Sequence, residues 1–213
     1  MPKPLNVLIL EDNPADAELL LIELRRAGYE PAWQLVDNEK GFTAYLKPEL
    51  DVILSDYSLP QFSGLQALKL RNESGYDIPF IIVSGAISEE IAVEYMREGA
   101  ADYLFKDRLG RLGMAVDNAI KEKRLRDQKQ QADQMLQENE EYLKTIFETT
   151  CVATAVIEED TTLSMVNKEF EVLSGYSKEE LEGKKSWTEF VSAEDLKRMQ
   201  EYHRQRRIDP EKH

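Results

Sequence analysis

Short apolar runs alternate with stretches of helical periodicity along the first half of the chain. The runs predict five strands, at residues 5–10, 31–36, 51–55, 79–84 and 101–105. Runs with few polar interruptions, such as Val52-Ile53-Leu54, are typical of strands that are covered on both faces. The alternation therefore predicts an α/β domain over residues 1–120, built on a five-stranded doubly wound parallel sheet.

The pattern changes at about residue 114, because no glycine or proline occurs from there to residue 149. Charged residues, glutamine and leucine dominate this stretch, which predicts one long linker helix over residues 114–149. A heptad seam with imperfect apolar content can be drawn through Leu125, Gln128, Ala132, Met135, Asn139, Tyr142 and Ile146. An isolated helix of this polarity is marginal in water, so a coiled coil that makes a homodimer is favoured. A solvated helix that packs on its own domains is the alternative.

A third pattern covers residues 140–213. Two β-prone runs, at 152–157 and 163–167, flank a polar turn and predict a hairpin. Short helices are predicted at 168–173 and 178–181. Because sheet and helix are segregated here, this part is predicted to begin an α+β domain.

Composition limits the range of functions. The net charge of −14 over 213 residues argues against a nucleic-acid surface, so protein partners and no nucleic acid are expected. No run approaches the roughly 18 apolar residues that a membrane span needs, so no direct membrane insertion is expected. Cys151 is the only cysteine, which is typical of a chain in the reducing cytoplasm.

Polar residues follow four of the predicted strands. Glu11 and Asp12 come after the first strand, Asp56 after the third, Ser84 after the fourth and Lys106 after the fifth. The carboxyl ends of parallel strands meet at one edge, where doubly wound folds bind their ligands. These side chains are therefore predicted to share one pocket.

Grouped carboxylates raise one another's pKa unless a cation neutralises them. A hard cation with few protein ligands describes Mg²⁺ or Mn²⁺, and Asp12 and Asp56 are assigned as direct ligands. Asp56 would be a nucleophile that forms an aspartyl phosphate, while Lys106 and Ser84 stabilise the transferred group. Each residue also has a simpler interpretation: Asp12 could cap a helix, and Lys106 could be a solvated loop residue.

Residues 1–120 resemble a response-regulator receiver domain. The resemblance depends on Glu11-Asp12, Asp56 in Asp-Tyr-Ser-Leu-Pro, Ser84 in Val-Ser-Gly, and Lys106 with Tyr103 three residues before it. It implies that the Ser58 carbonyl is a third metal ligand and that Glu11 binds the metal through water. It also implies that Ser84 and Tyr103 form a switch, and that a sensor histidine kinase or phosphotransfer protein donates the phosphoryl group.

The sequence departs from the receiver pattern in two places. Asp107 follows Lys106 where the family usually has proline, so we expect either a trans bond with a reshaped loop or a strained cis bond. Asp107 could also cap a helix that begins at Arg108. Ser58 and Ala86 offer no carboxylate or carboxamide to assist water attack, which predicts slow autodephosphorylation.

Residues from about 140 resemble the front half of a PAS domain. The resemblance depends on the hairpin, Val166-Asn167-Lys168-Glu169-Phe170 and Leu173-Ser174-Gly175-Tyr176-Ser177. These motifs are structural, so the PAS ligand is unknown; Cys151 is expected to be buried and His203 solvated. The residues past 142 leave no room for the final three strands that the resemblance implies, so we expect a partial domain, from a longer chain or completed by a partner.

The sequence therefore predicts a phosphoacceptor protein of a two-component phosphorelay, not an enzyme, whose helical linker passes the phosphorylation state to a PAS module. One alternative is an aspartyl-phosphate phosphatase that uses Asp56. It is disfavoured because Ser58, two positions on, is not acidic. The other alternative is an inert interaction scaffold.

Overall fold

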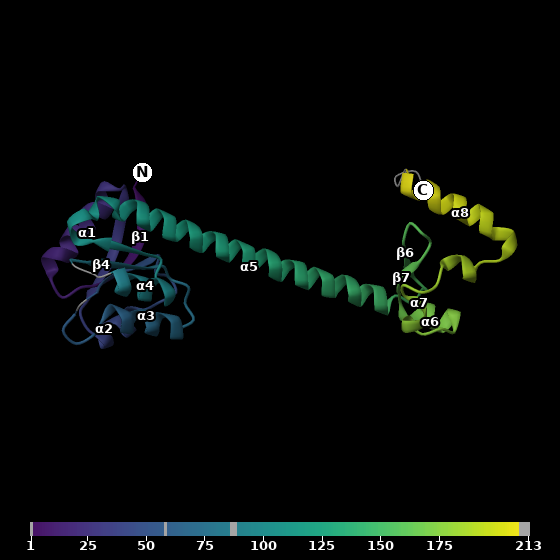
Figure 1. Cartoon of the computed structure of the whole chain (residues 1–213), viewed down its shortest axis with the longest axis horizontal. Helices are drawn as coiled ribbons and strands as arrows, with labels where there is room; N and C mark the ends of the chain where they lie inside the picture. Colours follow the sequence, from purple (N-terminus) through teal and green to yellow (C-terminus); the bar gives the residue numbers. More distant parts are fainter. Residues whose placement is uncertain (1, 58, 86–88, 209–213) are drawn as a thin grey trace. The chain divides into compact units, whose positions relative to one another are not determined.

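The computed structural model describes residues 2–57, 59–85 and 89–208. The chain divides into two compact units, residues 1–131 and residues 132–213. Each unit has its own hydrophobic core. Both units are shown in Figure 1.

The first unit contains one parallel sheet in the order β2-β1-β3-β4-β5. Its strands are β1 (Lys3–Leu10), β2 (Tyr29–Val36), β3 (Val52–Asp56), β4 (Phe80–Ser84) and β5 (Asp102–Phe105). All five overlap the predicted strands, and the boundaries of β3, β4 and β5 differ from the prediction by one residue at most. The predicted five-stranded doubly wound sheet is thus confirmed.

Helices cover both faces of this sheet (Figure 1). Alternate residues of a strand point to opposite faces. Ile9, Leu54 and Val83 pack with α1 (Pro14–Arg26) and the first turns of α5 (Leu112–Thr149). Their neighbours Leu8 and Ile53 belong to the opposite core. That core includes residues of α2 (Glu39–Tyr45) and α3 (Gly64–Glu73) and the buried Tyr95 of α4 (Glu89–Arg97).

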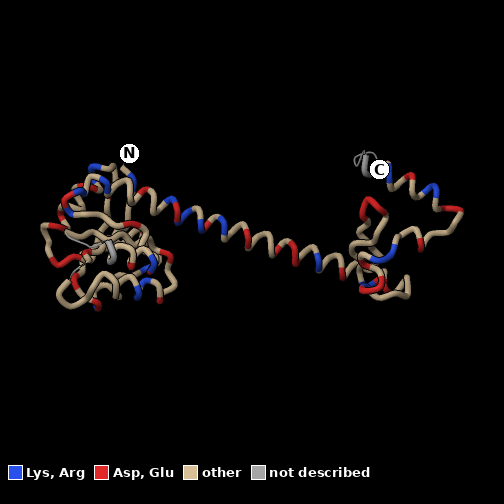
Figure 2. Tube along the Cα trace, viewed as in Figure 1, with Lys and Arg blue, Asp and Glu red and all other residues tan. Residues whose placement is uncertain are grey.

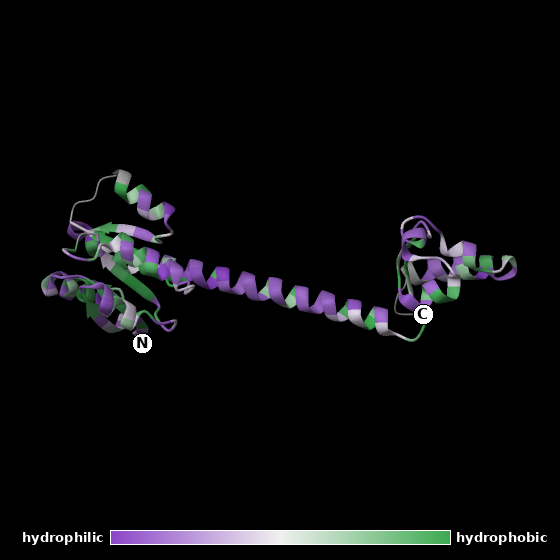
Figure 3. Cartoon of the chain, turned by 90° about the horizontal axis from the view of Figure 1, so that it is seen from below, coloured by the Kyte–Doolittle hydropathy of each residue, from purple (hydrophilic) through white to green (hydrophobic). Residues whose placement is uncertain are grey.

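Helix α5 is 38 residues long and begins two residues before the predicted start. Its buried residues all lie in the first turns, at Leu112, Gly113, Ala115, Val116 and Ala119. Farther along, basic residues predominate over 121–129 and acidic residues over 133–148 (Figure 2). The helix is predominantly hydrophilic (Figure 3). Several apolar side chains remain exposed on it, namely Leu125, Met135, Leu136, Tyr142, Leu143 and Ile146.

After α5, the second unit continues with the predicted hairpin, made of antiparallel β6 (Ala155–Ile157) and β7 (Leu163–Val166). The predicted short helices follow as α6 (Lys168–Ser174) and α7 (Lys178–Leu181). A 3₁₀ helix, η2 (Trp187–Phe190), and α8 (Ala193–Ile208) complete the described part. Leu163, Val166, Leu181 and Trp187 form a small buried core.

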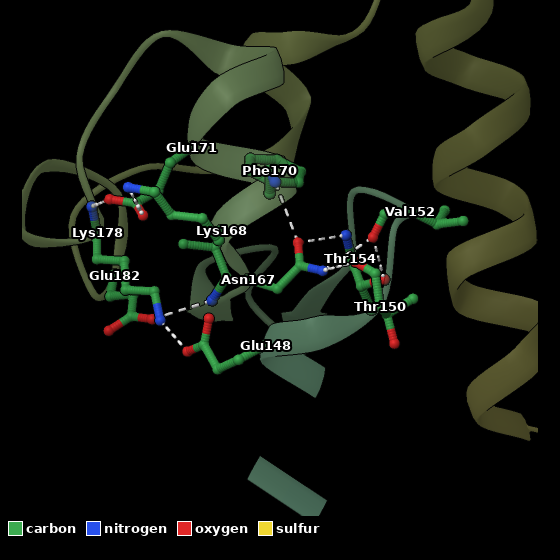
Figure 4. Close-up of polar contacts among 11 residues, drawn as sticks. Glu148, Thr150, Val152, Thr154, Asn167, Lys168, Phe170, Glu171, Lys178 and Glu182 are labelled. Carbon is green, nitrogen blue, oxygen red and sulfur yellow. Dashed lines mark hydrogen bonds and ion pairs between the residues drawn. The ribbon is translucent and has the colours of Figure 1, made fainter. Parts of the chain in front are cut away.

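Asn167, which is fully buried, is the polar centre of the second unit. Its Oδ1 accepts hydrogen bonds from the backbone N–H groups of Thr154 and Phe170, at 2.9 and 3.0 Å. Its Nδ2 donates to the carbonyls of Val152 and Thr150, at 2.8 and 3.3 Å. As Figure 4 shows, this one side chain joins the segment after α5 to the start of α6.

Lys178 also connects this unit to the end of α5, because its ammonium forms an ion pair with Glu148 (Figure 4).

Two expectations about the second unit are wrong. Cys151 is exposed and lies outside the hairpin strands. His203 is half-buried, with its ring centroid 6.0 Å from that of Trp187.

Candidate functional site

Acidic side chains gather at the carboxyl ends of β1 and β3. Glu11 is buried, Asp56 is half-buried and Asp12 is exposed, and one carboxylate oxygen of each lies within 4.8 Å of the others. Strand order explains the cluster, since β1 and β3 are adjacent and Leu10 pairs with Ser55. The predicted convergence of these three residues is observed.

Lys106 reaches into this cluster from the end of β5. Its Nζ lies 2.7 Å from Glu11 Oε2 and 3.0 Å from Asp56 Oδ2. Its side chain is only 21% exposed, so the interpretation of Lys106 as a solvated loop lysine is wrong. This contact places a positive charge directly beside the Asp56 carboxylate, where it would stabilise an anionic group bonded to Asp56.

Asp16, which was not predicted from the sequence, is the nearest partner of Lys106. Asp16 Oδ2 lies 2.6 Å from the Lys106 Nζ. Asp16 lies in the first turn of α1, four residues after Asp12. The helix dipole stabilises acidic side chains at this position. The spacing of Asp16, one helical turn after Asp12, could have indicated that it faces the same pocket. An acidic residue in the first turn is, however, also common in helices without such a role.

The electrostatics of the pocket are dominated by this single cation. Burial lowers the pKa of Lys106, but hydrogen bonds to Asp16, Glu11 and Asp56 outweigh burial and raise that pKa above its ordinary value. Burial raises the pKa of the Glu11 carboxyl, against hydrogen bonds from Lys106 and the Asn13 backbone that lower it. Lys106 therefore remains a cation, and Glu11 is the carboxylate that depends most on it.

The local structure after β1 leaves Asp12 available to a ligand. Asn13 is the N-cap of α1, and its side chain accepts a hydrogen bond from Ala15 N at 3.1 Å. Pro14 occupies the first turn, where its missing N–H costs nothing. The interpretation of Asp12 as the helix cap is therefore wrong.

Gly64 supports the backbone beneath Asp56. A Cβ atom on Gly64 would lie 2.7 Å from the Asp56 carbonyl oxygen and 2.9 Å from Ser55 Oγ. Both distances are shorter than real Cβ contacts, so only glycine fits without a shift. The first residue of α3 thus packs directly against the end of the strand that presents Asp56.

The two predicted switch residues lie on neighbouring strands. Ser84 is buried at the end of β4, and its strand partner is Phe105, the residue before Lys106. Tyr103 on β5 is 39% exposed and lines a shallow surface pocket with Val93 and Met96 of α4. Ser84 therefore lies at the sheet edge that carries the acidic cluster, while the Tyr103 ring lies at the outer surface.

The loop after Lys106 takes the first of the two predicted forms, because the Lys106–Asp107 peptide bond is trans. The chain continues into a 3₁₀ helix, η1 (Lys106–Arg111), whose N-cap is Phe105. Asp107 therefore lies in the first turn, and the prediction that it caps a helix beginning at Arg108 is wrong. The predicted Ser58 carbonyl ligand and the position of Ala86 lie outside the described residues.

The cluster fits a small hard cation. Glu11, Asp12 and Asp56 supply carboxylate oxygens within a few ångströms of one another, and Asp12 is not used as a helix cap. Oxygen donors of this kind, with room for water on the exposed Asp12 side, are what Mg²⁺ binds. Lys106 neutralises only part of the acidic charge, so a divalent cation would lower the remaining repulsion.

Comparison with known proteins agrees with this geometry. Residues 7–117 match the family described as the response regulator receiver domain. The chain is 34% identical over 103 residues to the DNA-binding dual master transcriptional regulator RpaA of a Synechocystis species, covering 47% of this chain and 42% of RpaA. It is 32% identical over 102 residues to the phosphate regulon transcriptional regulatory protein PhoB of Klebsiella pneumoniae, covering 47% and 44%.

The chain thus spans less than half of the length of each of these relatives. Both are transcriptional regulators, and RpaA is described as DNA-binding, so the expectation of no nucleic-acid partner gains no support. Within the described residues, no helix is long and apolar enough to cross a membrane.

Solved structures show the same fold. A response regulator receiver domain protein from Clostridium thermocellum superimposes with a TM-score of 0.50 and 25% identity, covering 57% of this chain and 98% of that one. The response regulator StyR superimposes with a TM-score of 0.54 and 23% identity, covering 64% and 68%, and shows the fold alone. Through residues 7–117, the chain belongs to the response regulator receiver domain family of two-component systems.

Proposed function

We propose that this chain accepts a phosphoryl group on Asp56. The observation that supports this best is the 3.0 Å approach of the Lys106 ammonium to the Asp56 carboxylate, beside two further carboxylates. Receiver domains interact with sensor histidine kinases or phosphotransfer proteins, so a phosphohistidine of such a partner is the proposed donor.

The reaction is a transfer between two nucleophiles. An Asp56 carboxylate oxygen attacks the phosphorus in line and forms a P–O bond, while the bond from phosphorus to the donor nitrogen breaks. The leaving imidazole keeps that electron pair. Lys106 holds one phosphoryl oxygen with its positive charge, and Ser84 at the neighbouring strand end donates to another.

Receiver domains bind Mg²⁺ at an acidic pocket, and Mn²⁺ is an acceptable substitute. In this chain Asp12 and Asp56 would hold the ion directly, with the Ser58 carbonyl as a third ligand and Glu11 through water. The bound ion supplies charge neutralisation for the phosphoryl oxygens. Glu11 also orders the entry to α1, because its Oε1 accepts a hydrogen bond from Asn13 N at 3.2 Å.

The proposed switch joins Ser84 to Tyr103. Ser84 lies buried at the pocket edge, and Tyr103 projects from the next strand at the surface near α4. If Ser84 moves toward the phosphoryl group, the space it leaves can admit the Tyr103 ring. A local change in charge would then alter the outer surface of β5 and α4.

We propose that α5 passes this state onward as one strand of a homodimeric coiled coil. Its seam residues Leu125, Met135, Tyr142 and Ile146 are exposed in the single chain, and pairing two copies would bury them. The second unit, with its hairpin and the short helix capped by Asn167, is proposed to be a PAS-like output module. Glu148 and Asn167 connect it to the end of α5.

The test uses the full chain with acetyl phosphate and Mg²⁺, followed by intact mass. One stable phosphoryl addition is expected in the unsubstituted chain and none in Asp56→Asn, which keeps the shape of the side chain. Lys106→Met should slow the addition about a hundredfold, as loss of one stabilising charge typically does. Release of phosphate without stable addition would favour an aspartyl-phosphate phosphatase, and neither addition nor release would favour an inert scaffold.

The proposed autodephosphorylation is slow, because Ser58 and Ala86 offer no carboxylate or carboxamide to orient a water molecule for attack. After the donor is removed, the phosphoryl group should remain on the purified chain for minutes or longer. Complete loss within seconds would contradict this part of the proposal.

A further inference from the structure

The three N–H donors of the Lys106 ammonium each face a carboxylate. The distances from its nitrogen are 2.6 Å to Asp16, 2.7 Å to Glu11 and 3.0 Å to Asp56. An ammonium in this state has no donor left for a further partner. An arriving phosphoryl oxygen can therefore reach Lys106 only by displacing one of the three carboxylates.

Burial decides which carboxylate is displaced at the lowest cost. The Glu11 side chain is 1% exposed, and a buried carboxylate that loses its cation pays a large desolvation cost. Asp56 is the proposed acceptor itself and stays beside Lys106 after transfer. The Asp16 side chain is 29% exposed, so water can replace the ammonium when that contact breaks.

We propose that Asp16 is a positioning residue that holds Lys106 in the resting pocket and competes with the phosphodonor for its ammonium. The inference depends on the proposed role of Asp56. Asp16 also places one more negative charge beside a site that must receive an anionic phosphoryl group. Without that charge, Glu11 and Asp56 still hold Lys106, and one of its donors is free.

The consequence is a specific split in the kinetics. The competition acts on the approach of the donor, so the neutral variant Asp16→Asn should lower the half-saturating concentration of acetyl phosphate about three- to tenfold. The groups that act during transfer are unchanged, so the saturated rate should stay within about twofold. A purely structural role of Asp16 would lower the saturated rate or leave both quantities unchanged.

The experiment measures phosphorylation of the full chain with Mg²⁺ over a range of acetyl phosphate concentrations. Asp16→Asn and Asp16→Ala are the neutral variants, and Asp16→Glu keeps the charge and should behave like the unsubstituted chain. Glu18→Gln is the matched control, because it removes one exposed charge from the same helix without contacting Lys106. Calorimetric binding of beryllofluoride, a phosphoryl mimic that does not react, should show the same tightening in the neutral variants.

Thermal unfolding without Mg²⁺ identifies the variants that fold, and Asp16→Ala replaces Asp16→Asn if the latter does not. An unchanged or higher half-saturating concentration in a folded neutral variant, with weaker or equal beryllofluoride binding, would overturn the role of Asp16 alone. Failure of the unsubstituted chain to accept any phosphoryl group would overturn the proposed function of Asp56 and this inference with it.

Discussion

The Tyr29 hydroxyl donates a 2.6 Å hydrogen bond to the Asp117 carboxylate, which fastens the first turns of α5 to β2. Lys3 of β1 adds an ion pair to the same oxygen at 3.1 Å. The N-terminal part of α5 therefore contacts two strands of the sheet, β1 and β2, through Asp117. The first turns of α5 are therefore held to the sheet by polar contacts as well as by the hydrophobic core.

This contact predicts a pH dependence of stability. The hydrogen bond from Tyr29, with help from Lys3, lowers the pKa of Asp117 below its ordinary value. A lowered folded-state pKa stabilises the fold above the unfolded pKa, and that stabilisation is lost as the pH falls through the folded value. Tyr29→Phe should therefore cost about 0.5–1 kcal/mol near pH 7, and progressively less as the pH falls below about 4, the ordinary pKa of an aspartate.

Urea unfolding of the two proteins at a series of pH values measures that difference. Tyr45→Phe is the matched control, because the exposed Tyr45 makes no hydrogen bond through its hydroxyl in the described structure. A Tyr29→Phe difference that stays constant with pH would show that Asp117 is not the partner that matters.

Gly64 leaves no room for a side chain beneath the backbone of Asp56. Gly64→Ala would press its Cβ against the Asp56 carbonyl oxygen and should cost about 1–3 kcal/mol in the free energy of unfolding. Gly110→Ala is the control, because a Cβ at Gly110 meets nothing within 4 Å and should change stability by less than about 0.5 kcal/mol. Equal effects of the two substitutions in urea unfolding would contradict the packing argument.

The side-chain hydrogen bonds of Asn167 are expected to stabilise the second unit. Asn167→Ala would leave two N–H groups and two carbonyls without the partner they now share, at a cost of about 2–4 kcal/mol. Hydrogen exchange followed by mass spectrometry should show faster exchange in residues 150–190 and no change in the receiver unit. The exposed Lys168→Ala is the control, and equal exchange in both variants would show that Asn167 is not the polar centre of this unit.

The heptad seam predicts a dimer that one charge can weaken. Met135 is 68% exposed in the single chain and occupies a seam position. Met135→Glu should weaken self-association about tenfold or more, because it would bury an unpaired charge between two helices. Sedimentation velocity over a concentration series measures this, with Gln137→Glu on the outer face of the heptad as the control. A monomer at all concentrations, before any substitution, would exclude the coiled coil.

Much of the receiver unit could be predicted because its signals are local. Runs such as Val52-Ile53-Leu54 are apolar throughout, which marks a strand that is covered on both faces. Asp56 and Lys106 could be brought together because parallel strands place their carboxyl ends at one edge. Local signals also predicted the second unit. A polar turn between two β-prone runs indicated the hairpin, and Asn167 is a typical N-cap for the helix that follows it.

The remaining features depend on tertiary packing. Asp16 faces Lys106 only because the first turn of α1 and the end of β5 meet across the sheet edge, which sequence spacing does not record. Aspartate is a common helix cap, but here the helix begins at Lys106, so Asp107 lies inside its first turn. Cys151 follows the end of α5, and the strand begins later, at Ala155, so the thiol is exposed rather than in the core.

Mapping the phosphorylated residue shows directly whether Asp56 accepts the phosphoryl group. After incubation with acetyl phosphate and Mg²⁺, borohydride reduces an aspartyl phosphate to homoserine, and peptide mass mapping identifies the residue. We expect homoserine at position 56, in an amount that follows the degree of phosphorylation, and none in Asp56→Asn. Homoserine at Asp12 or Asp16, or phosphorylation without any homoserine, would contradict the assignment of Asp56 as the phosphoacceptor.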